Sequence, residues 1–251
     1  MTADLEGRVA LVTGALGKLG PVWITALAGA GARVIGVDVR AGEVEGIGPV
    51  EVADVTDREA LLALRERLGA VDVLVNNAGV DQPPAGAGDS SAIEDVPFDD
   101  FRHVLDVNLA GTFLVTQVFG SAMRDAGRGS IVNIGSLYAG IAPDPGMYDH
   151  LGLDPPFLKP PAYGASKAGV VSLTRYFARL WGPYGVRVNT LSPGGVLGGQ
   201  DPEFVRKFTA RTPLRRLADG DDLTGALLFL ASDASRYVTG HELRVDGGFT
   251  A

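Results

Sequence analysis

Tyr163 and Lys167 lie four residues apart in the run YGASK. Four residues is about one helical turn, so both side chains project from the same helix face. A free tyrosine has a pKa of about 10 and exchanges protons poorly at pH 7. A neighbouring ammonium favours the phenolate and lowers that pKa, which suits acid–base catalysis. An amphipathic helix with a solvated lysine explains the isolated pair equally well, so the rest of the chain has to decide.

A glycine-rich segment, TGALGKLG, follows the first expected strand and opens a helix-like run. Its glycines are Gly14, Gly17 and Gly20. Glycines allow the backbone to approach a pyrophosphate, which then binds at the helix N-terminus. Asp38 comes 18 residues after Gly20, where a carboxylate binds the adenosine ribose hydroxyls. Because Asp38 would repel a 2′-phosphate, the sequence predicts NAD rather than NADP, with Arg40 and Lys18 as the residues able to reverse this preference.

Composition excludes several classes of protein. The 251 residues are 46% hydrophobic with a mean hydropathy of +0.16, enough for a sizeable core. A net charge of −8 and a pI of about 4.9 argue against nucleic acid or anionic membrane as a partner. The sequence has no cysteine, which excludes disulfides, thiolate metal sites and a cysteine nucleophile, and its three scattered histidines predict no metal site. We find no leader-like segment and no apolar run long enough to cross a bilayer, so we expect a cytoplasmic protein.

Apolar, β-branched segments alternate along the chain with longer segments of helical period. Unbroken apolar strands between helices are typical of a parallel sheet covered on both faces. We predict one α/β domain over residues 1–251, a doubly wound Rossmann sheet of about seven strands flanked by helices. The expected strands are 8–13, 33–38, 50–53, 71–76, 130–135, 186–191 and 242–245, and the expected helices are 19–30, 57–68, 98–123, 162–181 and 223–232. Thr56 or Asp57 would cap the second helix. The segment 38–54 is short, so the connection between the second and third strands is expected to be a loop rather than a helix.

Two segments interrupt this alternation where strands reach their C-terminal edge, the place where ligands bind in such sheets. Residues 140–161 contain six prolines together with polar and aromatic side chains. Residues 194–215 begin with glycines and continue in a charged, helix-like stretch. We predict that the first is a substrate loop, in which Tyr148 and His150 contact the substrate, and that the second is a lid.

Further motifs occur in a characteristic order. NNAG ends at Gly79, Asn108 follows Asp-Val, and Ser136 follows Ile-Gly; after Tyr163 and Lys167 come Pro-Gly at 193–194 and VDGG at 245–248. Together with the glycine loop, these motifs make the chain similar, over essentially its whole length, to the compact single-domain branch of the short-chain dehydrogenases/reductases. The resemblance implies an NAD(P)-dependent oxidoreductase acting on CH–OH groups.

The resemblance also implies residue roles. Tyr163, as phenolate, would accept the substrate hydroxyl proton while hydride passes to the nicotinamide, and Ser136 would bind the substrate oxygen. Lys167 would lower the tyrosine pKa and bind the nicotinamide ribose, Asn108 would hold a water in the proton relay, and Asp54 would bind the adenine amino group. The implied cofactor-binding residues are Gly14, Leu16, Gly17, Lys18, Leu19, Gly20, Asp38, Asp54, Val55, Asn77, Ala78, Gly79, Tyr163, Lys167, Pro193, Gly194 and Val196.

The sequence departs from the family pattern at three places. Lys18 stands where the compact branch usually has a glycine, and its ammonium is either solvated or reaches the pyrophosphate. Gly198 stands where a threonine often binds the nicotinamide amide, so that contact is in doubt and a more mobile lid is expected. Ser136 and Tyr163 are 27 residues apart, further than is usual, so the segment 140–161 enters the chain beside the reacting centre.

A polar and aromatic loop at this place suits a hydroxyl-rich substrate, and the loop resembles family members associated with sugars and sugar acids. We therefore predict an NAD-dependent dehydrogenase acting on a secondary alcohol or ketone of a sugar, sugar acid or polyol. A reductase of a non-sugar carbonyl compound is the alternative. A non-catalytic NAD(H)-binding sensor would not need the proton relay. The resemblance also implies a homotetramer or dimer, with the helix that carries Tyr163 and the preceding long helix at the interface.

Overall fold

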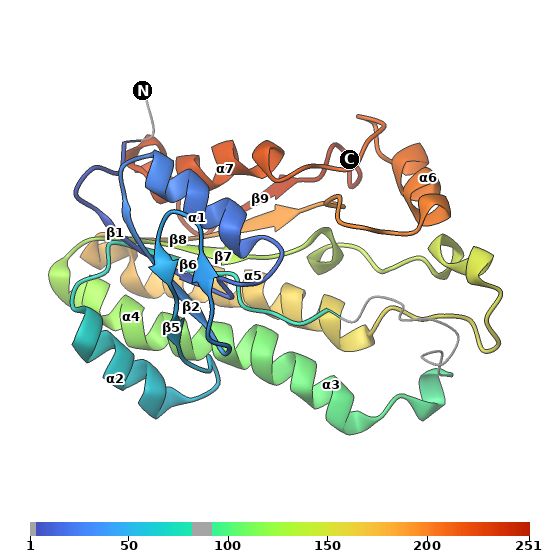
Figure 1. Ribbon diagram of the computed structural model, residues 1–251, viewed down its shortest axis with the longest axis horizontal. Coiled ribbons are helices and arrows are strands. Elements are labelled where there is room, and N and C mark those ends of the chain that lie inside the picture. Colours follow the sequence, from blue (N-terminus) through green and yellow to red (C-terminus); the bar gives the residue numbers. More distant parts are fainter. Residues whose placement is uncertain (1–3, 82–91) are drawn as a thin grey trace.

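Seven apolar strands lie side by side in one parallel sheet, in the order β5-β2-β1-β6-β7-β8-β9 (Figure 1). The computed structural model describes residues 4–81 and 92–251. The strands are β1 (Val9–Thr13), β2 (Arg33–Asp38), β5 (Glu51–Val52), β6 (Val73–Asn76), β7 (Gly129–Ile134), β8 (Val186–Pro193) and β9 (Glu242–Val245). The chain order reverses between β1 and β6, which opens a crevice at the C-terminal ends of these two strands. The predicted doubly wound sheet is confirmed.

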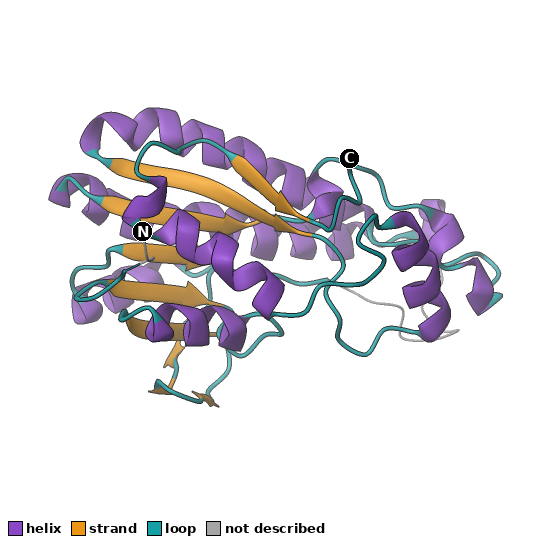
Figure 2. Ribbon diagram, turned by 90° about the horizontal axis from the view of Figure 1, so that it is seen from above, coloured by secondary structure: helices purple, strands orange, loops and turns teal. Residues whose placement is uncertain are grey.

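Helices cover both faces of the sheet (Figure 2). One face is covered by α1 (Gly20–Gly29) and α7 (Asp221–Ala231), and the other by α2 (Arg58–Leu68), α4 (Thr112–Ala126) and α5 (Pro161–Trp181). Trp23 and Leu227 are fully buried in the first layer, and Phe119 and Trp181 are buried in the second. Because the central strands β1 and β6 have an apolar layer on both sides, their sequences are almost continuously hydrophobic.

The connection between β2 and β5 contains no helix, as expected: residues 39–50 form a short hairpin of β3 (Glu43–Val44) and β4 (Gly48–Pro49). The predicted cap of α2 is Asp57, whose carboxylate accepts hydrogen bonds from the backbone N–H groups of Glu59 and Ala60 at 3.0 and 3.1 Å. This cap satisfies two of the donors left free at a helix N-terminus.

The expected continuous helix 98–123 is wrong in one respect. The segment is divided into α3 (Phe98–Leu105), a π-helical turn (Asp106–Gly111) and α4. At the end of this turn, Thr112 Oγ1 donates a hydrogen bond to the Asn108 carbonyl at 2.8 Å. The apolar periodicity of a sequence does not reveal a π-helical turn. Such a turn contains one extra residue, which rotates the following apolar residues around the helix axis by less than the width of the buried face.

The expectation that no segment is long and apolar enough to cross a bilayer is also wrong. Among the residues that the structure describes, the continuous helical segment Phe98–Ala126 passes that test by length and composition, with a mean hydropathy of 1.2 over its most apolar window. Half of that window is buried inside the fold, where α4 packs on β6 and β7. We attribute the apolar composition to this core position.

The remaining helical elements lie mostly around the C-terminal edge of the sheet. Helix α6 (Pro202–Arg211) projects beyond the strand ends (Figure 1) and begins at Asp201, whose side chain accepts hydrogen bonds from two backbone N–H groups of its first turn. Short 3₁₀ turns are Ile93–Asp95, Leu137–Ala139, Pro145–Met147, Asp149–Leu151, Gly182–Tyr184 and Asp233–Ser235.

Two mid-helix glycines provide a test of the core. At Gly120 in α4, an added Cβ would lie 2.3 Å from the ring of Trp181, whereas nothing lies within 4 Å of such an atom at the exposed Gly225 in α7. We expect Gly120→Ala to lower the free energy of unfolding by about 1–3 kcal/mol through overpacking. Gly225→Ala should instead raise it by up to about 1 kcal/mol through helix propensity. Urea denaturation of both variants measures this, and equal effects would contradict the described packing of α4 on α5.

Candidate active site

A cavity of about 840 Å³ opens at the C-terminal edge of the sheet, and residues from most of the predicted motifs line it. The predicted site residues on its wall are Gly14, Gly17, Lys18, Leu19, Asp38, Asp54, Val55, Asn77, Ala78, Gly79, Ser136, Tyr148, His150, Tyr163, Lys167, Pro193, Gly194 and Val196. Three further predicted residues, Leu16, Gly20 and Asn108, are not part of this wall. The structure therefore brings the predicted cofactor and catalytic residues to a single place.

The side chain of Asn77 ties the glycine-rich loop to the end of β6. Its Nδ2 donates hydrogen bonds to the carbonyls of Thr13 and Gly14, both at 3.0 Å, and its Oδ1 accepts one from Trp23 Nε1 at 2.8 Å. Gly14 has a φ of +66°, and a Cβ there would lie 2.8 Å from the Cα of Ala78. This position therefore requires glycine for its conformation and for the close approach of the two loops.

Two carboxylates lie on the cavity wall, one at the end of β2 and one shortly after β5. Asp38 is buried, and its oxygens accept hydrogen bonds from the backbone N–H groups of Leu16 at 3.0 Å and Arg40 at 3.1 Å. Asp54 accepts hydrogen bonds from the backbone N–H and hydroxyl of Thr56, both at 2.8 Å. Fixed carboxylates at these strand ends are suited to accept hydrogen bonds from ribose hydroxyls and an amino group.

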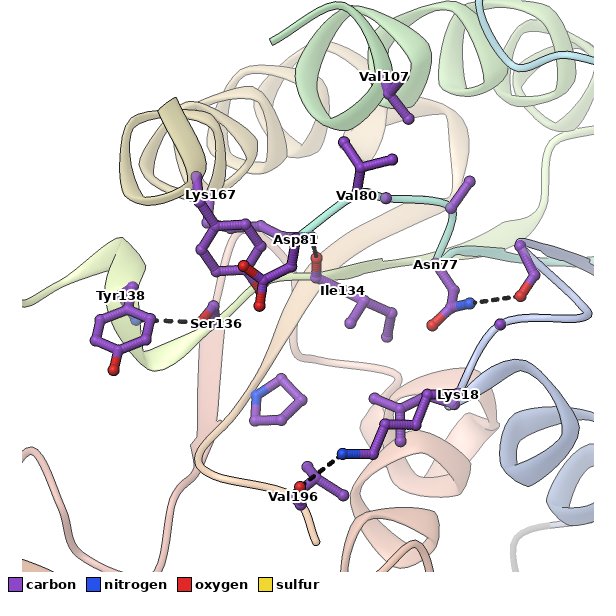
Figure 3. A pocket seen from close by; sticks show the side chains of 18 of the residues that line it. Lys18, Asn77, Val80, Asp81, Val107, Ile134, Ser136, Tyr138, Lys167 and Val196 are labelled. Carbon is purple, nitrogen blue, oxygen red and sulfur yellow. Dashed lines mark hydrogen bonds between the residues drawn. The ribbon is translucent and has the colours of Figure 1, made fainter. Parts of the chain in front are cut away.

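The predicted catalytic side chains come from β7 and α5. Ser136 follows the end of β7, and its hydroxyl accepts a hydrogen bond from the backbone N–H of Tyr138 at 3.2 Å. Lys167 is buried on α5 and donates a hydrogen bond to the Ile134 carbonyl at 2.9 Å, and its ammonium lies 5.7 Å from the centre of the Tyr163 ring (Figure 3). The geometry places a hydroxyl, a phenol and an ammonium beside the same part of the cavity.

The expected lowering of the Tyr163 pKa is not what the structure gives. Burial, and then the charge of Asp81, raise the pKa of Tyr163, while the neighbouring Ser136 hydroxyl acts in the opposite direction. Burial also lowers the pKa of Lys167 to about 8, so this lysine is only partly protonated in mildly alkaline solution. The spacing of Tyr163 and Lys167 indicates the effect of the lysine charge, but it carries no information on the desolvation of either group.

Asn108 lies in the π-helical turn and is fully buried. Its Oδ1 accepts a hydrogen bond from the Val80 N–H at 2.8 Å, and its Nδ2 donates to the Val80 carbonyl and to Ser166 Oγ, both at 3.1 Å. The side chain thus fixes the segment after β6 against α5. Its predicted part in a proton relay stays a prediction.

The side chain of Lys18 is not simply solvated, because it contacts the backbone of the predicted lid. Its ammonium donates a hydrogen bond to the Val196 carbonyl at 2.7 Å, across the cavity mouth (Figure 3). A Cβ at Gly198 would lie only 2.3 Å from the end of the lysine side chain. The lysine therefore joins the glycine-rich loop to the predicted lid and occupies space that a side chain at position 198 would fill.

An apolar cluster joins the predicted substrate loop to α6. Tyr148 is buried between Phe157 and Phe204. The centre of its ring lies 4.7 Å from that of Phe157 and 5.4 Å from that of Phe204. Met147 and Phe208 extend the cluster. Tyr148 lines the cavity as predicted, although most of its surface packs against other aromatic rings. The segment 140–161 is therefore held in place by a small core of its own.

Charged side chains reinforce this contact at its rim. Arg211 of α6 forms an ion pair with Asp144 at 2.5 Å, and Lys207 pairs with Asp149. His150 lines the cavity, but its Nε2 lies 2.9 Å from a carboxylate oxygen of Asp201 at the start of α6. The structure gives His150 a contact with the predicted lid, and its role as a substrate ligand stays a prediction.

Sequence reasoning missed a charged pair on the substrate side of the cavity. Lys159 Nζ lies 2.7 Å from one carboxylate oxygen of Asp81 and 2.8 Å from the other, and both residues line the cavity. The only sequence signal was that Asp81 follows directly after NNAGV at the end of β6. Within the described part of the chain, no group of three or more His, Asp or Glu side chains is placed to hold a metal ion.

Comparison with known proteins identifies the family. Residues 8–149 match the family model described as short chain dehydrogenase, and residues 155–250 match the model described as Enoyl-(Acyl carrier protein) reductase. The chain belongs to the short-chain dehydrogenase/reductase family. It is therefore an oxidoreductase that acts on CH–OH groups, and the family uses nicotinamide cofactors.

Among its relatives, the chain is 36% identical to D-threitol dehydrogenase of Mycolicibacterium smegmatis, over 98% of this chain and 94% of that protein. It is also 36% identical to galactitol 2-dehydrogenase (L-tagatose-forming) of Cereibacter sphaeroides, over 98% and 96%. Both relatives are named as polyol dehydrogenases, and the match covers almost the whole length of each.

Solved structures agree with this assignment. A short-chain dehydrogenase from Leptospira borgpetersenii with bound NAD+ superimposes with a TM-score of 0.87 at 33% identity, covering 100% of this chain and 95% of that one. A gluconate 5-dehydrogenase from Burkholderia cenocepacia in complex with NADP and tartrate gives a TM-score of 0.83 at 31% identity, covering 99% and 97%. Similar proteins thus bind either dinucleotide.

The contact between Lys18 and Val196 yields a test of how the lid is held. We expect Lys18→Met to increase the NADH dissociation rate about fivefold or more, because the loss of a charge-assisted hydrogen bond frees the lid. Stopped-flow NADH fluorescence measures this rate. Arg206→Met is the control, since Arg206 is exposed and pairs with Glu203 within α6. An unchanged rate in Lys18→Met would show that the contact does not hold the lid.

Proposed function

We propose that this protein is an NAD-dependent dehydrogenase that interconverts a secondary alcohol and a ketone of a polyol, sugar or sugar acid. The observation that carries the proposal is the convergence of Ser136, Tyr163 and Lys167 on the cavity that also contains the glycine-rich loop and Asp38. One end of the cavity has a hydroxyl, a phenol and an ammonium, and the other has a glycine-rich loop and a carboxylate. This arrangement suits a dinucleotide-dependent hydride transfer.

The residues present fit a dinucleotide. The backbone at Gly14 has no room for a Cβ, the loop leads into the N-terminus of α1, and Asp38 faces the cavity from the end of β2. We infer that the glycine-rich loop holds the pyrophosphate, Asp38 the adenosine ribose and Asp54 the adenine amino group. When bound there, the nicotinamide supplies the hydride acceptor or donor.

The proposed chemistry of the protein is the movement of one proton at the substrate oxygen. Ser136 positions that oxygen, and Tyr163 donates a proton to it in ketone reduction or, as phenolate, accepts one in alcohol oxidation. Lys167, with a pKa of about 8, exchanges protons in the range where the tyrosine must be reloaded. Because burial favours the phenol, reduction is favoured near neutral pH, and oxidation requires more alkaline solution.

The substrate class rests on the loop and on the relatives. The cavity beside Tyr163 is lined by Tyr138, Tyr148, His150, Lys159 and Asp81, which offer several hydrogen-bonding groups. Two relatives of similar length are named as dehydrogenases of threitol and galactitol. We propose that residues 140–161 form the substrate loop and residues 194–215 the lid within a single domain, 1–251.

The location and assembly of the protein stay predictions. On the predicted interface helices, Val171 and Phe177 are buried in the monomer core, while Phe113, Tyr176 and Leu180 are exposed on α4 and α5. These three exposed side chains support a homotetramer or dimer assembled through that face.

Replacement of the phenol tests the mechanism. Tyr163→Phe should lower the rate of NAD reduction with a polyol substrate by at least about a thousandfold, because the proton acceptor is lost. In the unsubstituted enzyme, kcat/KM for oxidation should rise about tenfold per pH unit from pH 7 to 9, since the raised pKa of Tyr163 leaves little phenolate at neutral pH. NADH absorbance measures both. A flat profile, or an active Tyr163→Phe, would exclude Tyr163 as the base.

Replacement of Asp38 tests the cofactor. The enzyme should prefer NAD, because the buried carboxylate of Asp38 repels a 2′-phosphate. Asp38→Ser should shift the ratio of kcat/KM for NADP against NAD by at least about tenfold toward NADP, since Arg40 then faces the phosphate without its carboxylate. In Asp38→Ser/Arg40→Met this gain should disappear. An NADP preference in the unsubstituted enzyme would overturn the assignment.

A further inference from the structure

The charged pair Asp81–Lys159 presents its two members differently to the cavity. The side chain of Asp81 is 41% exposed, whereas that of Lys159 is only 8% exposed. The ammonium contacts both carboxylate oxygens, at 2.7 and 2.8 Å. The lysine therefore lies behind the carboxylate and fixes it, and the carboxylate is the group that a ligand meets.

The pair lies directly beside the predicted acid–base tyrosine. The Lys159 ammonium is 5.1 Å from the centre of the Tyr163 ring and 5.8 Å from that of Tyr138. After burial, the charge of Asp81 is the next largest cause that raises the pKa of both tyrosines. Figure 3 shows Asp81 on the wall of the cavity that Lys167 and Tyr138 also line. A substrate with its reacting oxygen at Tyr163 would have its neighbouring carbons within reach of Asp81.

We propose that Asp81, held by Lys159, accepts hydrogen bonds from hydroxyls next to the reacting carbon, and so selects neutral polyols and sugars over sugar acids. This inference rests on the proposed function and narrows its substrate class. An ionised carboxylate has about four acceptor positions, and the lysine occupies one on each oxygen. The remaining positions match two adjacent hydroxyl donors.

The same geometry disfavours a substrate carboxylate at this position. An anionic group would face the accessible Asp81 charge, and like charges brought together without water are costly. To reach Lys159 instead, it would have to displace both contacts with Asp81 and approach a side chain that is only 8% exposed. An acceptor for hydroxyls is therefore favoured over an anion site.

The other carboxylates of this region have a different role. Asp144 pairs with Arg211, Asp149 with Lys207, and Asp201 lies against His150. Each of these contacts joins the loop 140–161 to the segment that contains α6. Asp81 and Lys159 instead join the segment after β6 to the segment before α5. The Lys159 ammonium lies 5.1 Å from the centre of the Tyr163 ring, which places the pair at the proposed reacting centre.

The test measures binding rather than turnover. In the Tyr163→Phe background with NADH bound, calorimetric titrations compare threitol with threonate and galactitol with galactonate, pairs that differ in one terminal group. We expect each polyol to bind at least about tenfold more tightly than its acid. Adding Asp81→Asn, which keeps the shape and removes the charge, should weaken polyol binding and reduce this ratio about tenfold.

Two further variants make the result specific. Lys159→Met should also weaken polyol binding, because Asp81 loses the group that orients it. Asp144→Asn is the matched control: this carboxylate is exposed to a similar degree, 44%, and pairs with Arg211, so its loss should leave the ratio unchanged. All variants should bind NADH like the parent, which also shows that they are folded.

The outcomes separate this inference from the proposed function. Tighter binding of the acids, a ratio that Asp81→Asn leaves unchanged, or NADH binding without any polyol binding would overturn the role of Asp81. Selective polyol binding that depends on Asp81 would support it even if the unsubstituted enzyme showed no turnover. The absence of turnover would instead count against the proposed dehydrogenase activity.

Discussion

A row of buried polar side chains across three central strands fixes the site. Asn76 of β6, Asn133 of β7 and Thr190 of β8 lie opposite one another in the sheet register. Asn76 donates to Asn133 at 2.8 Å and to Thr116 of α4 at 2.9 Å, and Asn133 donates to Thr174 of α5 at 2.8 Å, which in turn contacts Thr190 at 2.7 Å. Leaving a buried polar group without its partner costs about 1–3 kcal/mol, so a shift of one strand or helix would break several contacts at once.

The same row of polar side chains fixes the position of Lys167. Thr174 lies seven residues, about two helical turns, after Lys167, so both side chains are on the same face of α5. With Thr174 held by β7 and β8, Lys167 reaches the Ile134 carbonyl at the end of β7, two residues before Ser136. The sheet and α5 thus form a rigid wall, while the opposite wall consists of the loop 140–161 and α6, joined by their own aromatic cluster. Under the proposed function, reactivity depends on the first wall, and substrate choice depends on the second wall together with Asp81.

The sequence predicted the segments that form both walls, but it did not predict the contacts made by the second wall. Strands buried on both faces and helices of regular period are visible as local patterns, and the motifs follow strand ends, so the sheet and the residues around its edge were predictable. The pairing of Asp81 with Lys159 was not, because the two residues are 78 positions apart and meet through loop geometry. The π-helical turn at Asn108 and the raised pKa of Tyr163 were missed for another reason: both depend on packing and desolvation, which no spacing rule contains.

The two departures from the family pattern at Lys18 and Gly198 depend on each other, because the lysine side chain occupies the space that a side chain at position 198 would fill. Taken separately, each looks like a loss: a side chain intrudes on a loop that is usually glycine, and a lid position loses a side chain that usually binds the cofactor. In the structure the lysine crosses the cavity mouth to Val196 and passes through the space where a residue at 198 would carry its Cβ. Gly198 therefore leaves the space that Lys18 needs to reach Val196, and Lys18 supplies a contact between the glycine-rich loop and the predicted lid. The expected increase in lid mobility does not follow from Gly198 alone, because the missing side chain is replaced by one from the opposite side of the cavity.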